Sequence, residues 1–215
     1  MPTLGYWAIR GLAQPIRLLL KYAGEDFDDV MYEQGDAPEY SRESWTKVKF
    51  TLGLPIPNLP YYVDGNIKIT QSNAILRYIA RKHQLLGEKE EERVKVDVML
   101  DTAMDFRNGI VGLCYNPEFE KKKAAYFEAL PAKLEMFKSF LGDQQFFAGS
   151  KVTVCDFPIY ELLDQTRIMQ PGSLDAFPTL LAFMGRIEAL PAIKTFMSSA
   201  KFIRRPIINK SALFK

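Results

Sequence analysis

The sequence predicts an α/β domain followed by an all-α domain. Strand-like runs occur only up to about residue 70, where they alternate with helical patterns, and the longer apolar patterns after residue 90 all repeat at helical spacing. The 215 residues suit one large domain or two small ones. We therefore place an α/β domain at residues 1–83, a linker at 84–90 and a helical domain at 91–215, which are normal domain sizes.

The composition excludes several classes of protein. A hydrophobic fraction of 47% predicts a sizeable core rather than disorder, and a net charge of +2 lacks the basic excess of nucleic-acid binders. The sequence has no apolar run long enough for a membrane span and no signal-peptide pattern, so we expect a cytoplasmic protein with no membrane partner. The two distant cysteines, Cys114 and Cys155, and the single histidine, His83, predict a reducing compartment and no metal centre.

The α/β domain begins with a strand–helix–strand unit. Thr3–Trp7 and Asp26–Tyr32 are predicted strands. Between them, Gln14-Pro15 favours a helix start because proline fits the first turn, and Gly24 favours its end. This order requires a parallel pair of strands joined by a helical crossover.

The second part of this domain is a hairpin followed by a helix. After a polar loop at 33–42, a short helix is expected at Ser44–Phe50. Two short strands, Tyr61–Val63 and Asn66–Ile69, flank an Asp-Gly pair that is a strong hairpin signal. Residues 70–73, Thr-Gln-Ser-Asn, are typical N-cap residues before a helical pattern that continues to residue 83.

The second half contains only helical patterns and an irregular end. The predicted helices are Glu91–Tyr115, Pro117–Leu141, Leu162–Met169, Pro178–Ala189 and Pro191–Ser198. Pro131 predicts a kink or a break in the second of them. Thr153–Asp156 is a variant of the capping box, and the residues from 202 onward follow no regular pattern.

Two places in the first domain are predicted to bind a small anionic peptide. The start of the helix after Thr70 offers backbone N–H groups to a carboxylate or phosphate, and Gln71 and Ser72 add side-chain donors. If the Leu59–Pro60 bond is cis, Leu59, beside Asn58, is expected to pair with an extended peptide as an added strand would. The alternative is an ordinary hairpin followed by a capped helix.

Tyr6 is the candidate for chemistry because it lies at the carboxyl end of the first strand, the edge that ligands favour in α/β sheets. A thiol has a pKa of about 8.5, and lowering it by about two units requires roughly 2.7 kcal/mol. One charge-assisted hydrogen bond contributes about 1.5–3 kcal/mol, so a phenol could stabilise a bound thiolate. The alternative is that Tyr6 and Trp7 are ordinary core aromatics of a strand.

Several longer motifs carry a family resemblance. They are LGYW at 4–7, IRGLAQPIRLLL at 9–20, GDAPEY at 35–40, KF at 49–50, PNLPYYVDG at 57–65, ITQSNAILRYIARKH at 69–83, CYNPEFEK at 114–121 and T-x-x-D-F at 153–157. With them the chain resembles a Mu-class cytosolic glutathione transferase from residue 4 to about residue 206. The GDAPEY loop is the motif that indicates this class.

The resemblance implies a thioredoxin-like domain (βαβ–ββα) joined to a helical domain, a homodimer, and conjugation of glutathione to hydrophobic electrophiles in detoxification. It implies that glutathione is a co-substrate and that no further cofactor or metal is needed. A non-catalytic ligand-storage protein and a structural, lens-type protein of the same fold are the alternatives.

The resemblance also assigns roles to residues. Tyr6 matches the phenol that stabilises the thiolate. The residues that match glutathione-binding positions are Gln71 and Ser72 for the γ-glutamyl carboxylate, Asn58 and Leu59 for the cysteinyl part, Trp7, Arg42, Trp45 and Lys49 for the glycyl end, and Asp105 for the γ-glutamyl ammonium of the neighbouring subunit. The residues that match the electrophile pocket are Ile9, Leu12, Met104, Val111, Tyr115 and Ile208.

This chain departs from the family pattern at three places. Ile56 stands where the family has an aromatic wedge that inserts into the partner subunit, and the smaller side chain buries less area, on the order of 1 kcal/mol less per site. Phe106 and Arg107 alter the helix beside Asp105. Asn108, Ile208 and Asn209 give the electrophile pocket a shape of its own.

Overall fold

A computed structural model describes residues 1–214. Its four-stranded sheet has the order β2-β1-β3-β4. The strands are β1 (Thr3–Trp7), β2 (Asp28–Tyr32), β3 (Tyr61–Asp64) and β4 (Ile67–Thr70). β1 and β2 are parallel, whereas β1 pairs with β3, and β3 with β4, in antiparallel fashion. The predicted crossover and hairpin are therefore both confirmed.

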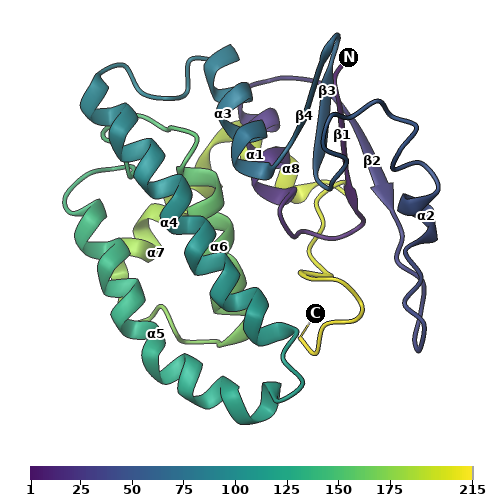
Figure 1. Ribbon diagram of the computed structural model, residues 1–215. Helices are drawn as coiled ribbons and strands as arrows, with labels where there is room; N and C mark the ends of the chain where they lie inside the picture. Colours follow the sequence, from purple (N-terminus) through teal and green to yellow (C-terminus); the bar gives the residue numbers. More distant parts are fainter. Residues whose placement is uncertain (215) are drawn as a thin grey trace.

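Eight helices complete the described chain. They are α1 (Gln14–Tyr22), α2 (Glu43–Thr46), α3 (Ser72–Lys82), α4 (Glu90–Cys114), α5 (Phe119–Leu141), α6 (Asp156–Met169), α7 (Pro178–Ala189) and α8 (Pro191–Ser198). In Figure 1, α4–α7 form one side of the molecule, the sheet and α2 form the other, and α1, α3 and α8 lie between them. Helix α1 packs against α3, α6 and α8 and so connects the sheet to the helical part.

The largest differences from the sequence prediction are in β2, α2 and α6. β2 begins at Asp28 rather than at residue 26, and α2 is shorter than expected. α6 begins at Asp156, at the capping signal predicted for residues 153–156 but six residues before the predicted helical pattern, because nearly all of its residues are buried and its first turns show no amphipathic pattern. Pro131 does not break α5, in which it occupies an exposed position.

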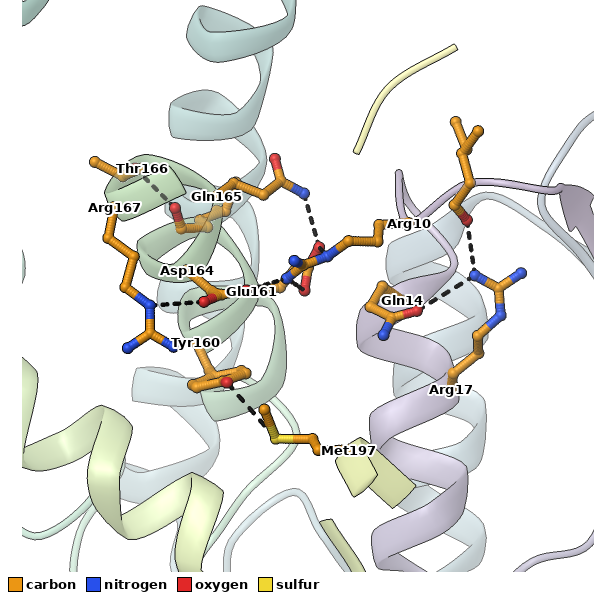
Figure 2. Close-up of polar contacts among 12 residues, drawn as sticks. Arg10, Gln14, Arg17, Tyr160, Glu161, Asp164, Gln165, Thr166, Arg167 and Met197 are labelled. Atoms are coloured by element: carbon orange, nitrogen blue, oxygen red, sulfur yellow. Dashed lines mark hydrogen bonds and ion pairs between the residues drawn. The ribbon is translucent and has the colours of Figure 1, made fainter. Parts of the chain in front are cut away.

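The two halves meet at a buried charge network. Arg10 follows β1, and its guanidinium reaches Glu161 and Asp164 on α6 (Figure 2). Its Nε lies 2.8 Å from Oε1 of Glu161, and Nη2 lies 2.6 Å from Oε2. All three side chains are at least nine-tenths buried, so the network fixes the loop after β1 against the helical part.

The same loop is held from two further directions. Arg17 on α1 is buried, and its Nη1 donates to the carbonyl of Ile9 at 2.8 Å (Figure 2). The backbone N–H groups of Arg10 and Gly11 donate to the carbonyls of Pro206 and Ile207, both at 3.0 Å. The C-terminal segment therefore packs on the β1–α1 loop, and residues 9–12 have little freedom to move.

Within residues 1–214, no helix is long and apolar enough to cross a membrane.

Candidate active site

Tyr6 lies near the end of β1 with its hydroxyl held by the loop described above. The backbone N–H of Leu12 donates to the phenol oxygen at 3.2 Å, which leaves the phenol proton available for another acceptor. Burial raises the pKa of Tyr6, and the Leu12 N–H opposes that rise only in part. The phenol is therefore protonated at neutral pH and is a hydrogen-bond donor.

Gly11 determines how closely this loop approaches the phenol. Its φ is +43°, in the left-handed region that favours glycine. A Cβ atom at this position would lie 2.6 Å from Cε1 and 2.7 Å from Oη of Tyr6. The absence of a side chain at Gly11 is thus a condition for the observed position of the hydroxyl.

Replacing Gly11 with alanine is expected to displace the Tyr6 ring and to lower kcat/KM by roughly 10- to 100-fold, since a displacement of about 1 Å has effects of this size. Gly24→Ala is the matched control, because Gly24 also has a positive φ, +69°, but its Cβ would have no neighbour within 4 Å. Steady-state kinetics of both variants separate displacement from backbone strain. Equal losses in the two variants would contradict a role of Gly11 in placing Tyr6.

Tyr6 lines a cavity of about 350 Å³ between the two halves of the chain, here called the large cavity. It brings together most of the residues predicted for the site: Tyr6, Trp7, Ile9, Arg42, Trp45, Lys49, Asn58, Leu59, Val111, Tyr115 and Ile208. These residues come from β1, the loop and helix after β2, the turn before β3, α4 and the C-terminal segment. The large cavity therefore has a mixed lining, to which both halves contribute polar and apolar side chains.

A second, small apolar cavity adjoins the large one. It holds three of the remaining predicted residues, Leu12, Ser72 and Met104. Gln71 and Asp105 are exposed and line neither cavity. The structure thus divides the predicted electrophile pocket between two neighbouring spaces.

The start of α3 differs in detail from the capping prediction. Gln71 is the N-cap residue, with φ of +72°, and Ser72 is the first helical residue. No side chain caps this end, so the predicted hydroxyl or amide cap is wrong. A non-glycine residue in the left-handed region is uncommon and is found disproportionately at binding sites, so Gln71 remains a candidate contact for an anion at this helix end.

The Leu59–Pro60 bond is cis, as the peptide-binding hypothesis required. However, the Leu59 N–H donates to Oδ1 of Asn58 at 2.9 Å. The Leu59 N–H therefore already has an acceptor within the chain. Pairing with a peptide requires the Asn58 side chain to turn away.

Trp45 is a core residue as well as part of the cavity lining. Its ring packs edge-on against Tyr32 and stacks on Tyr61, with ring centroids 5.3 and 6.0 Å apart. Trp45 is only 6% exposed, so α2 is anchored to the core through this ring. Lys49 follows on the same segment, and its Nζ lies 5.2 Å from the centroid of the Phe50 ring.

Sequence reasoning missed several residues of the site. The large cavity is also lined by Gly11, Arg107, Gln165, Ile207 and Asn209. The sequence marks Arg107 and Asn209 only as departures from the family pattern. Gln165 and Ile207 carry no local signal, because only the packing of α6 and of the C-terminal segment brings them to the cavity.

Comparisons with known proteins agree with this architecture. The profile described as "Glutathione S-transferase, N-terminal domain" matches residues 2–81, and "Glutathione S-transferase, C-terminal domain" matches residues 104–200. The chain is 55% identical to "Glutathione S-transferase Mu 2" of Mus musculus over 212 residues, which covers 99% of this chain and 97% of the relative. The chain belongs to the Mu class of glutathione S-transferases. It is also 53% identical to "Glutathione S-transferase Mu 1" of Oryctolagus cuniculus, over 98% of this chain and 96% of the relative.

Solved structures of the transferase family show the same fold. The glutathione S-transferase Blo t 8 superposes with a TM-score of 0.90 at 34% identity, covering 99% of both chains. The Pi-class enzyme of Onchocerca volvulus superposes with a TM-score of 0.87 at 29% identity, covering 98% of this chain and 99% of that one. This Mu-class transferase therefore has a thioredoxin-like half followed by a helical half, and it is an enzyme of glutathione transfer.

Proposed function

We propose that Tyr6 of this transferase stabilises the glutathione thiolate, which then attacks a hydrophobic electrophile in the adjoining apolar space. The observation that carries the proposal is the hydrogen bond from the Leu12 N–H to the Tyr6 oxygen. That contact uses the phenol as an acceptor and leaves its proton for a sulfur atom in the cavity. The sulfur forms the new bond to carbon, and the leaving group departs with the electron pair of the broken bond.

The other roles follow the same arrangement. Trp7, Arg42, Trp45 and Lys49 hold the glycyl end in the polar part of the large cavity, and Asn58 and Leu59 contact the cysteinyl part. Gln71 and Ser72 bind the γ-glutamyl carboxylate at the start of α3. Ile9, Leu12, Met104, Val111, Tyr115 and Ile208 surround the electrophile. Glutathione is the co-substrate, and no further cofactor or metal is required.

The transferase is proposed to act as a homodimer in the cytoplasm. Several large apolar side chains are exposed in a single chain: Phe50, Ile56, Ile67, Val94 and Val98. A partner chain that covers them would remove apolar surface from water. Asp105, exposed on α4, would then reach the γ-glutamyl ammonium bound by the partner. Two buried cysteines without a disulfide suit a reducing compartment.

Ile56→Phe is expected to tighten the dimer. Ile56 is 67% exposed in the single chain, and a larger wedge gains on the order of 1 kcal/mol at each of the two sites, or roughly a 30-fold lower dissociation constant. Sedimentation equilibrium measures this constant, with Ile56→Leu as the control of equal volume. An unchanged constant for Ile56→Phe would contradict the wedge role of this position.

Two assays separate the enzyme from the alternative readings of the fold. A structural protein would not be retained on immobilised glutathione. A ligand-storage protein would bind glutathione or apolar ligands without turning over a chlorodinitrobenzene-type electrophile. The proposed function requires both retention and turnover, and the absence of either would overturn it.

A further inference from the structure

Arg107 lies where the two cavities meet. It is on α4, one turn from Val111 and two turns from Tyr115, and it lines both the large and the small cavity. Among residues 1–214, Gly11 and Gln165 are the two others that line both cavities. Of these three residues, Arg107 is the one with a positive charge. It places that charge between Tyr6, which donates a hydrogen bond to the thiolate, and the small apolar cavity.

The guanidinium of Arg107 is partly buried and has no carboxylate partner within residues 1–214. Its Nη1 lies 3.4 Å from Oδ1 of the neighbouring Asn108, at the long limit of a hydrogen bond. Burial lowers the pKa of Arg107, while the Tyr6 and Tyr115 hydroxyls oppose this. Even a lowered arginine pKa leaves the group charged at neutral pH.

The carboxylates near this junction are already engaged or point elsewhere. Glu161 lines the small cavity, but both of its oxygens accept hydrogen bonds from Arg10, and Gln165 Nε2 donates to it at 2.8 Å. Asp105, on the same helix as Arg107, is exposed and lines neither cavity. By contrast, Arg10, Arg17, Arg77 and Arg167 all pair with carboxylates.

We propose that Arg107 is a specificity-determining residue that selects electrophiles carrying an anionic group, above all a carboxylate. A partly buried guanidinium binds a carboxylate through two parallel N–H donors, and here these donors have only the long contact to Asn108 and no carboxylate among residues 1–214. The apolar residues around it hold the body of the electrophile, so that its reactive carbon faces the thiolate beside Tyr6. The inference rests on the proposed function, because it requires the electrophile to occupy this space.

The test compares two electrophiles that differ only in charge, 4-chloro-3,5-dinitrobenzoate and the neutral 4-chloro-3,5-dinitrobenzamide. In both, the glutathione sulfur bonds to the ring carbon that carries chlorine, and chloride leaves with the electron pair of the broken bond. We expect Arg107→Gln to lower the ratio of kcat/KM for the acid to kcat/KM for the amide at least tenfold. Arg107→Lys keeps the charge but lacks the two parallel N–H donors. Its acid-to-amide ratio of kcat/KM is expected to lie between those of wild type and Arg107→Gln.

Lys121→Gln is the control for net charge, because Lys121 is an exposed residue of α5 that lines neither cavity. It is expected to leave the ratio unchanged. A ratio unaffected by Arg107→Gln would overturn the inference. So would an equal loss with both electrophiles accompanied by a higher thiol pKa of bound glutathione, which would assign Arg107 to the thiolate. Wild-type enzyme that turns over neither electrophile would instead contradict the proposed function.

Discussion

Replacing Tyr6 with phenylalanine is expected to raise the thiol pKa of bound glutathione by about one to two units, the size of a lost charge-assisted hydrogen bond. The ring keeps its packing in a site where Tyr6 is only 5% exposed, so glutathione should still bind. If the wild-type thiol has a pKa near 6.5, the thiolate fraction at that pH falls roughly 5- to 50-fold, and turnover falls with it. A pH titration of thiolate absorbance measures the shift directly.

Tyr160→Phe is the matched control for this substitution. Tyr160 is also a buried phenol, with its hydroxyl 3.0 Å from Oε1 of Glu188 on the helical side, and it lines neither cavity. It is expected to leave the thiol pKa unchanged. An unaltered thiol pKa of glutathione bound to Tyr6→Phe would mean that another group donates the hydrogen bond to the thiolate.

Replacing Arg10 with methionine is expected to lower the free energy of unfolding by about 3–5 kcal/mol, since it leaves buried carboxylates without their cation. Glu161 and Asp164 have side chains only 2% and 8% exposed, so water cannot compensate them. Urea denaturation followed by tyrosine and tryptophan fluorescence measures the loss. Lys121→Met removes an exposed pair with Glu118 and is expected to cost less than about 1 kcal/mol.

The Arg10→Met loss should depend on pH. Burial raises the pKa of Glu161, and Arg10 opposes that rise, so removal of Arg10 raises the pKa further. A carboxyl group whose folded pKa lies above its unfolded value costs stability as pH rises above that unfolded value. The free energy of unfolding of the variant is therefore expected to lie further below that of wild type at pH 8 than at pH 5. A loss that is small and independent of pH would contradict the view that the network holds ionised groups.

Much of the fold could be predicted because the sequence marks the ends of its elements locally. The two proline-led helices α7 and α8 agree with their predicted ranges, and the Asp-Gly pair marks the hairpin of β3 and β4. The first turns of α6 are marked only by the capping signal at residues 153–156 and not by a helical pattern. Its residues 156–166 are all buried, so the alternation of polar and apolar faces that identifies a surface helix is missing.

The site shows the same division between local and distant information. Tyr6, Trp7, Asn58 and Leu59 lie within short motifs that could be recognised, and the structure brings them to one cavity. The Arg10–Glu161 pair joins residues 151 positions apart, and no feature of either segment indicates the other. Gln165 and Ile207 enter the cavity lining for the same reason, because their places depend on how α6 and the C-terminal segment pack.

The most direct test of the central claim is the pH dependence of kcat/KM with a chlorodinitrobenzene-type electrophile, measured for wild type and Tyr6→Phe. If the attacking group is a thiolate stabilised by Tyr6, the rate rises with pH through the thiol pKa of bound glutathione, and in the variant this rise moves to higher pH by the same one to two units found by titration. A rise at the same pH in both enzymes would contradict the claim and place the activation of glutathione elsewhere in the site.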